Sequence, residues 1–375
     1  MTALLEPRHE SLSLEARARC TQLEAHPESE GDDAGLARRV AALGYYRYLL
    51  PREYGGAFDS IDLRSVCVLR EELAYRNAAA DSLFAVQGLG AHPVVLAGSA
   101  ALQRELLPAA VDGRVLFAFA LSEAGAGSDV AALQTSARRD GDEYVLQGEK
   151  RFVSNAGVAT HYTVFARTAP GARGISAFVV PADAPGFTVR PRMHLLGDHP
   201  IAELELAECR VPAQARLGEE GGGMRLALAT LDVFRATVGA AAMGMARRAL
   251  DEAVAYSRAR RQFGAPLSAL QGVQFLLAES AAELDASRLL VLRAAAARDA
   301  GAERITYEAA VAKLFATEAA QRIVDRAVQI HGGNGVVRGH PVERLYRDVR
   351  ALRIYEGASE VQKLVIARHL LESER

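Results

Sequence analysis

The sequence lacks the features that mark several large classes of protein. It has no tryptophan and only three cysteines, Cys20, Cys67 and Cys209, which stand far apart and form no Cys-x-x-Cys pair. Cysteines at such spacing argue against a disulfide framework and fit a reducing compartment. The 44 basic and 46 acidic residues leave a net charge of −2. No basic excess therefore indicates binding to nucleic acid or to an acidic membrane.

Long apolar runs are also missing. The longest, residues 236–246, lies between Arg235 and Arg247 and is much shorter than the roughly 20 residues that a membrane-spanning helix needs. At the N-terminus, Glu6 and Arg8 come before any apolar run develops. We therefore expect no secretory signal, no membrane span and a soluble, cytoplasmic protein.

The signatures of several catalytic classes are absent as well. His194, His199 and His331 show no metal-ligand spacing, so no metal site is expected. No Gly-x-Ser-x-Gly sequence or Cys/His pair suggests a covalent nucleophile. No glycine fingerprint lies between a strand and a helix, which argues against a nicotinamide site of the Rossmann type.

What the sequence does contain is a change of periodicity along the chain. Residues 1–113 have apolar side chains at helical spacing, residues 114–222 read as short strands with a turn at Asp140-Gly141, and residues 223–375 return to long helices. We therefore predict an α+β, mainly α protein with three domains at these boundaries. They are an N-terminal helical domain, a middle β-barrel or β-sandwich domain and a C-terminal four-helix bundle.

The expected elements can be placed from the apolar pattern and from turn residues. Gly44 and Gly301 are predicted to stop helices. Strands are expected at 115–123, 135–155 (a hairpin), 161–167, 175–180, 187–191 and 202–211. Long helices are expected at 225–258, 267–300 and 303–330, and a last one after Gly357.

Residues 354–368, IYEGASEVQKLVIAR, contain a candidate base. Glu356 precedes Gly357 in a tight turn, and Ser359 is predicted to be the N-cap of the helix that follows. A carboxylate at a helix entrance can move, and an apolar lining would raise its pKa enough for it to act as a base. In isolation, a Glu before a helix more often only interacts with the helix dipole.

Two strings in the middle segment suit a planar cofactor. LSEAGAGSDV (121–130) follows a strand, and its backbone N–H groups could bind an anion or the polar edge of a cofactor. Its glycines alone would equally suit a long hairpin loop. In KRFVSNAG (150–157), Phe152 and Ser154 share one side of a strand, where they could contact a flat heterocycle. An ordinary half-buried strand is the alternative.

Three further strings lie in the helical C-terminal part. In LDVFR (231–235), Asp232 and Arg235 have a spacing typical of a surface ion pair. YSRARRQFG (256–264) ends a helix with arginines, which would suit either a phosphate site or a solvated basic terminus. QIHGGNG (329–335) ends a helix with three glycines, more than a simple C-cap requires.

Taken together and in this order, these strings closely resemble the acyl-CoA dehydrogenase family. LSEAGAGSDV and the set QIHGGNG, VERLYRD and IYEGASE are similar to its two signature regions, and YSRARRQFG and LGDHPIAELELAECRVP (196–212) fit between them. The likeness extends from about residue 30 to the end of the chain. It implies the three-part fold predicted above, with FAD between the β domain and the bundle. The FAD would be shared across a subunit interface, usually in a homotetramer, with a homodimer as the alternative.

The resemblance also implies a role for individual residues. Glu356 matches the catalytic base, and Ser154 would lie near flavin N5. Residues implied to bind FAD are Phe119, Leu121, Ser122, Gly127, Phe152, Ser154, Arg260, Gln262, Phe263, Gln271, Gln329, Gly332, Gly333, Ala358 and Glu360. Those from Arg260 to Gly333 would hold pyrophosphate and adenosine, partly from the neighbouring subunit. Residues implied to contact substrate are Ser128, Asp232, Arg235, Gly357 and Arg368.

The implied activity is the α,β-dehydrogenation of an acyl thioester, either an acyl-CoA or an acyl-carrier-protein thioester. Electrons would pass to a carrier resembling an electron-transfer flavoprotein. Alternatives on the same fold are an acyl-CoA oxidase, a flavin hydroxylase, an enoyl-thioester reductase and a non-catalytic relative. Glu356 counts against a hydroxylase, which typically lacks this residue, whereas oxidases keep it.

A few positions depart from the family pattern. Phe152 replaces a usual tryptophan, Gly339 stands where an acidic residue is common, and Ala358 lacks a frequent hydroxyl. Phe234 occupies the place from which some members take their base, so Glu356 is the only candidate here. The Phe234 ring is also expected to narrow the acyl pocket.

Overall fold

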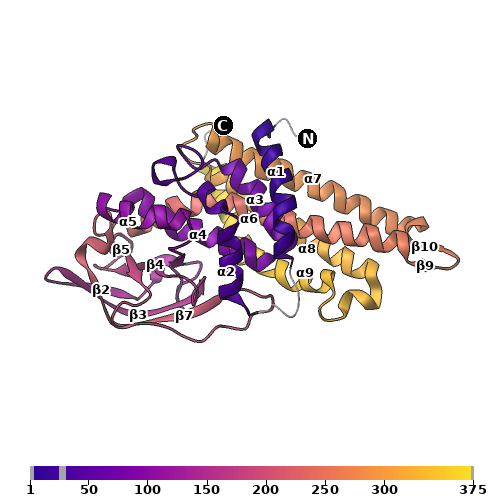
Figure 1. Ribbon diagram of the computed structural model, residues 1–375. Coiled ribbons are helices and arrows are strands. Elements are labelled where there is room, and N and C mark those ends of the chain that lie inside the picture. Colours follow the sequence, from indigo (N-terminus) through magenta and orange to yellow (C-terminus); the bar gives the residue numbers. More distant parts are fainter. Residues whose placement is uncertain (1–3, 25–30, 373–375) are drawn as a thin grey trace.

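The computed structural model describes residues 4–24 and 31–372 (Figure 1). Within these residues the N-terminal part is helical, and four of its helices begin at a residue whose side-chain oxygen accepts a backbone N–H of the first turn. The capping residues are Asp32, Asp62, Asn77 and Ser99, all of types favoured at N-caps. The helices are α1 (Pro7–Arg19), α2 (Asp33–Ala42), α3 (Leu63–Arg76), α4 (Ala78–Ala97) and α5 (Ala100–Val111).

The middle part is an eight-stranded sheet. Its strands are β1 (Phe117–Ala120), β2 (Ser136–Asp140), β3 (Glu143–Ser154), β4 (His161–Arg167), β5 (Ile175–Pro181), β6 (Phe187–Val189), β7 (Ile201–Pro212) and β8 (Arg216–Leu217). They pair in the order β6-β7-β3-β2-β4-β5-β8, with β1 parallel to β4 at one side. Leu146, Val164, Phe178 and Leu204 belong to a core of the sheet's own. The middle β domain is thereby confirmed.

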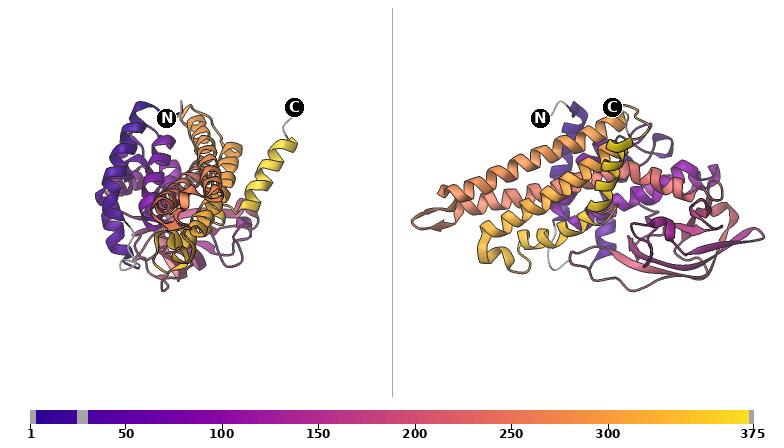
Figure 2. Two further views of the ribbon diagram at one scale, coloured as in Figure 1. Left: turned by 90° about the vertical axis from the view of Figure 1, so that its right-hand side faces the viewer. Right: turned by 180° about the vertical axis from the view of Figure 1, so that it is seen from behind.

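The C-terminal part consists of long helices. They are α6 (Gly223–Ala259), α7 (Gln271–Asp299), α8 (Thr306–His331), α9 (Pro341–Val349) and α10 (Ser359–Glu372). The three longest pack on one another, and α10 packs on α8 (Figure 2). A short hairpin of β9 (Arg261–Gln262) and β10 (Ala265–Pro266) joins α6 to α7. This hairpin lies at the end of the molecule away from the sheet (Figure 1).

By length and composition alone, α6 would qualify as a membrane span. However, 78% of its most apolar 18-residue window is buried inside the protein. Apolar surface on all sides is typical of a helix in the core of a large protein. The uninterrupted apolar run at residues 236–246 is only the middle part of this helix. Its burial shows why such a helix occurs in this fold.

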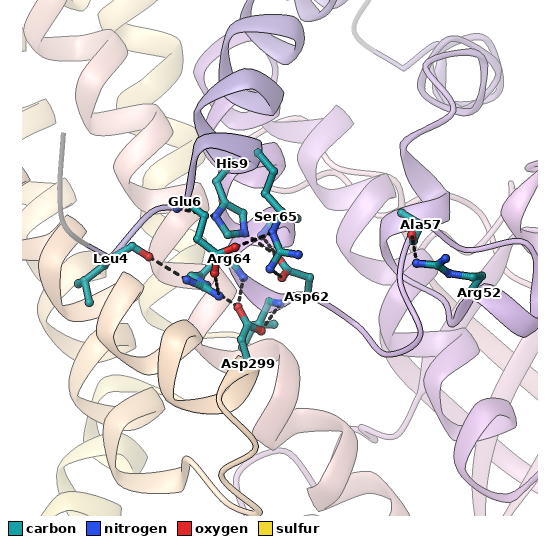
Figure 3. A network of polar contacts seen from close by, with 11 residues as sticks. Leu4, Glu6, His9, Arg52, Ala57, Asp62, Arg64, Ser65 and Asp299 are labelled. Atoms are coloured by element: carbon teal, nitrogen blue, oxygen red, sulfur yellow. Dashed lines mark hydrogen bonds and ion pairs between the residues drawn. The ribbon is translucent and has the colours of Figure 1, made fainter.

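Figure 3 shows polar contacts that join the N-terminal helices to the bundle. The Asp299 carboxylate at the end of α7 accepts hydrogen bonds from the backbone N–H of Leu63, at 2.6 Å, and from Nε of Arg64, at 2.7 Å. On the other side, His9 Nε2 lies 2.9 Å from Asp62 Oδ1. Burial opposes ionisation of Asp62, but the hydrogen bonds from His9 and Ser65 prevail and hold the pKa of Asp62 well below its ordinary value.

Most of the predicted elements are observed, but one helix was missed and one local prediction was wrong. Gly44 and Gly301 adopt left-handed conformations at helix ends, as expected. Helix α9 was not predicted. Ser359 is not an N-cap, because it is the first helical residue of α10 and its hydroxyl donates to Glu318 Oε1 at 2.6 Å. This long-range bond replaces the local one that the sequence suggested.

Candidate active site

The turn between η10 (Arg350–Arg353) and α10 has an unusual backbone. Glu356 has φ +51° and Gly357 has φ +94°. A left-handed residue that is not glycine costs roughly 1–2 kcal/mol and needs support from its surroundings. Gly357 suits this left-handed φ, and a Cβ there would also displace the amide end of Gln362, which holds the turn.

Side chains from three helices support this turn. Arg235 on α6 donates from Nε to the Glu356 carbonyl at 3.3 Å. Lys313 on α8 donates to the Gly357 carbonyl at 2.8 Å. Gln362 on α10 donates to the same Gly357 carbonyl at 2.8 Å. The conformation at Glu356 is therefore determined by tertiary contacts.

The Glu356 carboxylate is poorly satisfied by the protein itself. Its Oε2 atom is buried and has no hydrogen-bond partner among the described residues. Burial raises the pKa of Glu356 above its ordinary value, while the charges of Arg70, Lys313 and Arg235 act in the opposite direction. A buried carboxylate without a partner and with a raised pKa is suited to accept a proton from a bound molecule.

A buried ion pair lies near this carboxylate. Arg70 on α3 binds both oxygens of Asp81 on α4, at 2.8 and 2.7 Å, and its remaining terminal nitrogen donates to Thr237 Oγ1 at 2.8 Å. Both charged side chains are almost fully buried. Bidentate geometry of this kind holds a guanidinium rigidly. Arg70 therefore gives this region a fixed positive charge.

Phe234, predicted to narrow the acyl pocket, is fully buried. Its ring lies edge-on to His92, with 5.7 Å between the ring centroids. A Cβ on Gly88 would come within 2.6 Å of the Phe234 ring, so the absence of a side chain at this position of α4 leaves room for the phenyl group.

The loop after β1 is fixed by one carboxylate. Glu123 accepts hydrogen bonds from the backbone N–H groups of Gln134, at 2.6 Å, and Thr135, at 3.0 Å, and pairs with the buried Lys150 at 2.7 Å. Between these anchors, Gly127 and Ser128 are exposed. The loop is therefore held at its base and open at its tip.

Phe152 and Ser154 lie beside this loop, at the end of β3. Phe152 sits at an irregularity in the pairing of β3 with β7, has φ +56° and is 51% exposed. Bulges and strained residues of this kind often direct a side chain toward a functional site. Ser154 Oγ lies 2.7 Å from His199 Nε2, and Ser82 Oγ on α4 lies 3.3 Å from the same nitrogen.

Sequence models of three domains match this chain. The acyl-CoA dehydrogenase N-terminal domain matches residues 10–114, the middle domain residues 118–209 and the C-terminal domain residues 221–371. The chain belongs to the acyl-CoA dehydrogenase family.

Individual relatives agree with this assignment. The probable acyl-CoA dehydrogenase FadE25 of Mycobacterium tuberculosis is 42% identical over 332 residues, which are 88% of this chain and 85% of that protein. The cyclohexane-1-carbonyl-CoA dehydrogenase of Geobacter metallireducens is 40% identical over 97% of this chain and 96% of that protein. The structure of butyryl-CoA dehydrogenase from Megasphaera elsdenii has a TM-score of 0.92 at 34% identity, covering 99% of this chain and 100% of that chain.

As an acyl-CoA dehydrogenase family member, the protein is an enzyme of a flavoprotein oxidoreductase family. The predicted site residues fall into two groups in the structure. One group lies at the β-sheet edge and at the Glu356 turn, two places that are linked through α4, where Asp81 binds Arg70 and Ser82 contacts His199. Its members are Phe119, Leu121, Ser122, Gly127, Ser128, Phe152, Ser154, Arg235, Glu356, Gly357 and Ala358.

The second group lies toward the far end of the bundle. Tyr256 stacks on His331 with 4.4 Å between ring centroids, and its hydroxyl accepts a hydrogen bond from Asn334 at 3.2 Å. These contacts bring the end of α6 beside the end of α8. Predicted FAD residues that are exposed on these ends and on the start of α7 are Arg260, Gln262, Phe263, Gln271, Gln329, Gly332 and Gly333.

Three other predicted residues have distinct surroundings. Asp232 accepts hydrogen bonds from the backbone N–H of Ile305, at 3.2 Å, and from Thr306 Oγ1, at 2.7 Å, at the start of α8. Glu360 and Arg368 are exposed on α10. The predicted contacts of these three residues with substrate or FAD stay predictions.

Sequence reasoning missed several polar residues near the candidate site. Lys313 and Arg70 lie in strings with no signature of their own, whereas His199 lies in the string 196–212 that fits the family resemblance. A lysine or arginine within an apolar helical pattern was the one available clue for the first two. That string gave no clue to the contacts of His199, because its partners Ser82 and Ser154 are distant in sequence.

Proposed function

We propose that the protein is an FAD-dependent dehydrogenase of acyl thioesters, with Glu356 as the base that removes the α-proton. The observation that supports this most directly is the buried Oε2 of Glu356, which has no partner among the described residues. A buried oxygen without a hydrogen-bond partner destabilises the folded protein, and a bound ligand can relieve this cost. A substrate C–H group facing this oxygen would meet a base whose pKa is already raised.

The residues near the β-sheet edge fit a flavin. An exposed, strained Phe152 offers an apolar face, Ser154 offers a hydroxyl, and the open loop around Gly127 offers backbone N–H groups. FAD, when bound there, supplies the acceptor for the β-hydride at its N5 atom. These residues would hold its ring system.

The chain must also make the α-proton of a thioester acidic enough. Proton removal puts negative charge on the thioester carbonyl oxygen, and a donor aimed at that oxygen stabilises the charge. We propose a backbone N–H of the turn near Glu356 as this donor, because Arg235, Lys313 and Gln362 fix the orientation of its peptide groups. The positive charges of Arg70 and Arg235 in the same region favour the same state.

We further propose that the electrons pass to a carrier resembling an electron-transfer flavoprotein. An acyl-CoA oxidase would share Glu356, and only the reaction of the reduced enzyme with oxygen separates the two. An enoyl-thioester reductase would use the same site in the opposite direction. Both are distinguished by following the flavin spectrum after anaerobic addition of saturated or α,β-unsaturated thioesters, and then of air.

The deciding experiment uses Glu356→Gln, which keeps the shape of the side chain but cannot accept the proton. A panel of saturated acyl thioesters is first tested anaerobically for bleaching of the wild-type flavin. With a thioester that the wild type oxidises, the variant should still bind FAD. It should reduce the flavin at least roughly 10²-fold more slowly, because a positioned base contributes roughly 10²–10⁴-fold.

A matched control is Glu105→Gln, the same change at an exposed carboxylate outside the site. It should reduce its flavin at the wild-type rate. If Glu356→Gln bleaches within about tenfold of that control, another residue is the base. A protein that contains no flavin and does not take up added FAD would contradict the proposed chemistry as a whole.

A further inference from the structure

Lys313 is a fully buried lysine in the middle of α8. Lysine is rarely buried completely, because moving an ammonium out of water is costly unless it is well paired. Among the described residues, its ammonium forms no ion pair, and its hydrogen bond goes to the Gly357 carbonyl at 2.8 Å. The cost of burying this charge is therefore linked to the turn that contains Glu356.

The bond from Lys313 is part of a convergent arrangement. Gln362 Nε2 donates to the same Gly357 carbonyl at 2.8 Å and to the Glu356 carbonyl at 3.4 Å. The Glu356 carbonyl also accepts a hydrogen bond from Arg235. Two consecutive carbonyls thus receive donors from α6, α8 and α10. They belong to Glu356 and Gly357, the two left-handed residues of the turn.

We propose that Lys313 is a positioning residue for proton abstraction, because its ammonium fixes the Gly357 carbonyl and thereby the backbone from which the Glu356 carboxylate projects. The inference rests on the proposed role of Glu356 as the base. The Gly357 carbonyl belongs to the peptide group that follows Gly357, and the preceding peptide group is held at the Glu356 carbonyl by Arg235. With both peptide groups restrained, the backbone at Glu356 and the direction of its side chain are restricted. Reactions of this kind are sensitive to displacements of about 1 Å, which can lower the rate about 10²-fold.

Lys313 also acts through its charge. The charged groups that face Glu356 are Arg70 from α3, Asp81 from α4, Arg235 from α6 and Lys313 from α8. Of these, the three cations lower the pKa of Glu356 and Asp81 raises it. Burial lowers the pKa of Lys313 itself to about 8, although Glu356 opposes that shift.

The test is Lys313→Met, which keeps an unbranched apolar chain in α8 but removes both donor and charge. Flavin reduction by a saturating thioester is followed anaerobically as a function of pH. The limiting rate should fall about 10- to 100-fold, with the thioester Kd changed less than about threefold. Removing a positive charge raises the pKa of Glu356, and the base must be deprotonated to act. The acid limb of the profile should therefore move to higher pH.

Two companion variants separate position from charge. Gln362→Met removes the other donor to the Gly357 carbonyl without changing charge, so it should lower the rate and leave the acid limb in place. Lys313→Arg keeps charge and donors and should recover a large part of the rate. If Lys313→Met does not fold, these two variants still test the proposal, since Gln362→Met with an unchanged rate would overturn it.

The control is Lys363→Met, which removes an exposed ammonium from α10. The proposal is overturned if Lys313→Met matches this control within about twofold at every pH. It is also overturned if Lys313→Met weakens only thioester binding. Glu356→Gln shows whether only the role of Lys313 or the proposed function itself is wrong. If Glu356→Gln is inactive while Lys313→Met is normal, only the role of Lys313 is wrong. If Glu356→Gln keeps its rate, the proposed function itself is wrong.

Discussion

At the scale of single residues, backbone strain gathers where function was predicted. Among the described residues, five that are not glycine have positive φ: Phe152, Asn155, Glu208, Phe263 and Glu356. Three of them, Phe152, Phe263 and Glu356, are predicted site residues. A strained conformation persists only if its surroundings determine it, and it is often kept because the site requires it. The polar side chains around Glu356 provide such surroundings.

A residue-scale prediction concerns Asp348 on α9. Burial raises its pKa from 3.8 to about 7, and its Oδ1 has no partner among the described residues. The folded state therefore binds this proton more tightly than the unfolded state between about pH 4 and pH 7. The free energy of unfolding should fall as the pH rises through that window, and Asp348→Asn should abolish this part of the fall.

Urea unfolding of the wild type and of Asp348→Asn at pH 5 and pH 8 measures the effect. The free energy of unfolding of Asp348→Asn, taken relative to that of the wild type, should be higher at pH 8 than at pH 5. The charge of the nearby Asp198 also raises the pKa of Asp348. The pH dependence of the free energy of unfolding is therefore measured for Asp198→Asn as a comparison. Parallel pH curves for Asp348→Asn and the wild type would show that Asp348 is not buried as described.

At the scale of elements, helices of the bundle are stabilised by residues of other helices. The first turn of α8 has no side-chain cap from its own N-cap residue, Ile305. The cap comes from Asp232 on α6, whose carboxylate binds the start of α8. A carboxylate at a helix N-terminus also interacts favourably with the helix dipole. Capping of α8 is therefore a structural role for Asp232 that requires no contact with a substrate.

An element-scale prediction follows for Asp232→Ala. Loss of the cap should lower the free energy of unfolding by about 1 kcal/mol, within the range of 0.5–2 kcal/mol measured for N-caps. Thr306→Val, which removes one of the two bonds, should have a smaller effect. Both are measured by urea unfolding without thioester. An unchanged stability together with a weaker thioester Kd would assign Asp232 to substrate binding alone.

At the scale of the whole molecule, the two groups of predicted FAD residues lie in different parts of the single chain. The hairpin after Arg260 lies at the opposite end from the sheet (Figure 1). Exposed apolar side chains lie on the hairpin, along α7, after α8 and on α10 in the single chain, and exposed apolar surface of this kind can mark interfaces. They are Phe263 (92% exposed), Phe275, Leu289, Val336, Val337, Leu364 and Leu371. We therefore propose that FAD sites are completed between subunits of a homotetramer or homodimer.

The prediction at this scale is that Arg260→Ala loses FAD. A charge-assisted bond to phosphate contributes on the order of 2 kcal/mol, so the Kd of FAD should rise roughly 30-fold. Arg258→Ala removes an exposed arginine from the same helix end and should retain FAD. Absorbance after dialysis, with size-exclusion chromatography, measures both cofactor and assembly. Full FAD occupancy in Arg260→Ala would make this helix end a solvated basic terminus.

Much of the fold follows from the sequence alone, because the features that define it are local. Helical and alternating periodicities located the strands and long helices, and glycines such as Gly44 and Gly301 marked helix ends. The strings LSEAGAGSDV (121–130), QIHGGNG (329–335) and IYEGASE around Glu356, with those between them, were sufficient to predict the family. Helix α9 was missed because its nine residues make only about two and a half turns, although its buried Val342, Leu345 and Val349 do recur at helical spacing.

Only the tertiary structure decided which partners these residues have. Lys313 and Gly357 are 44 residues apart, Arg70 and Thr237 are 167 apart, and Ser82 and His199 are 117 apart. No local pattern encodes such pairs, since each depends on how whole helices and the sheet pack. The left-handed turn at Glu356 is determined in the same way. Its conformation is unfavourable by itself, and it is stable because donors from three helices meet at its carbonyl groups.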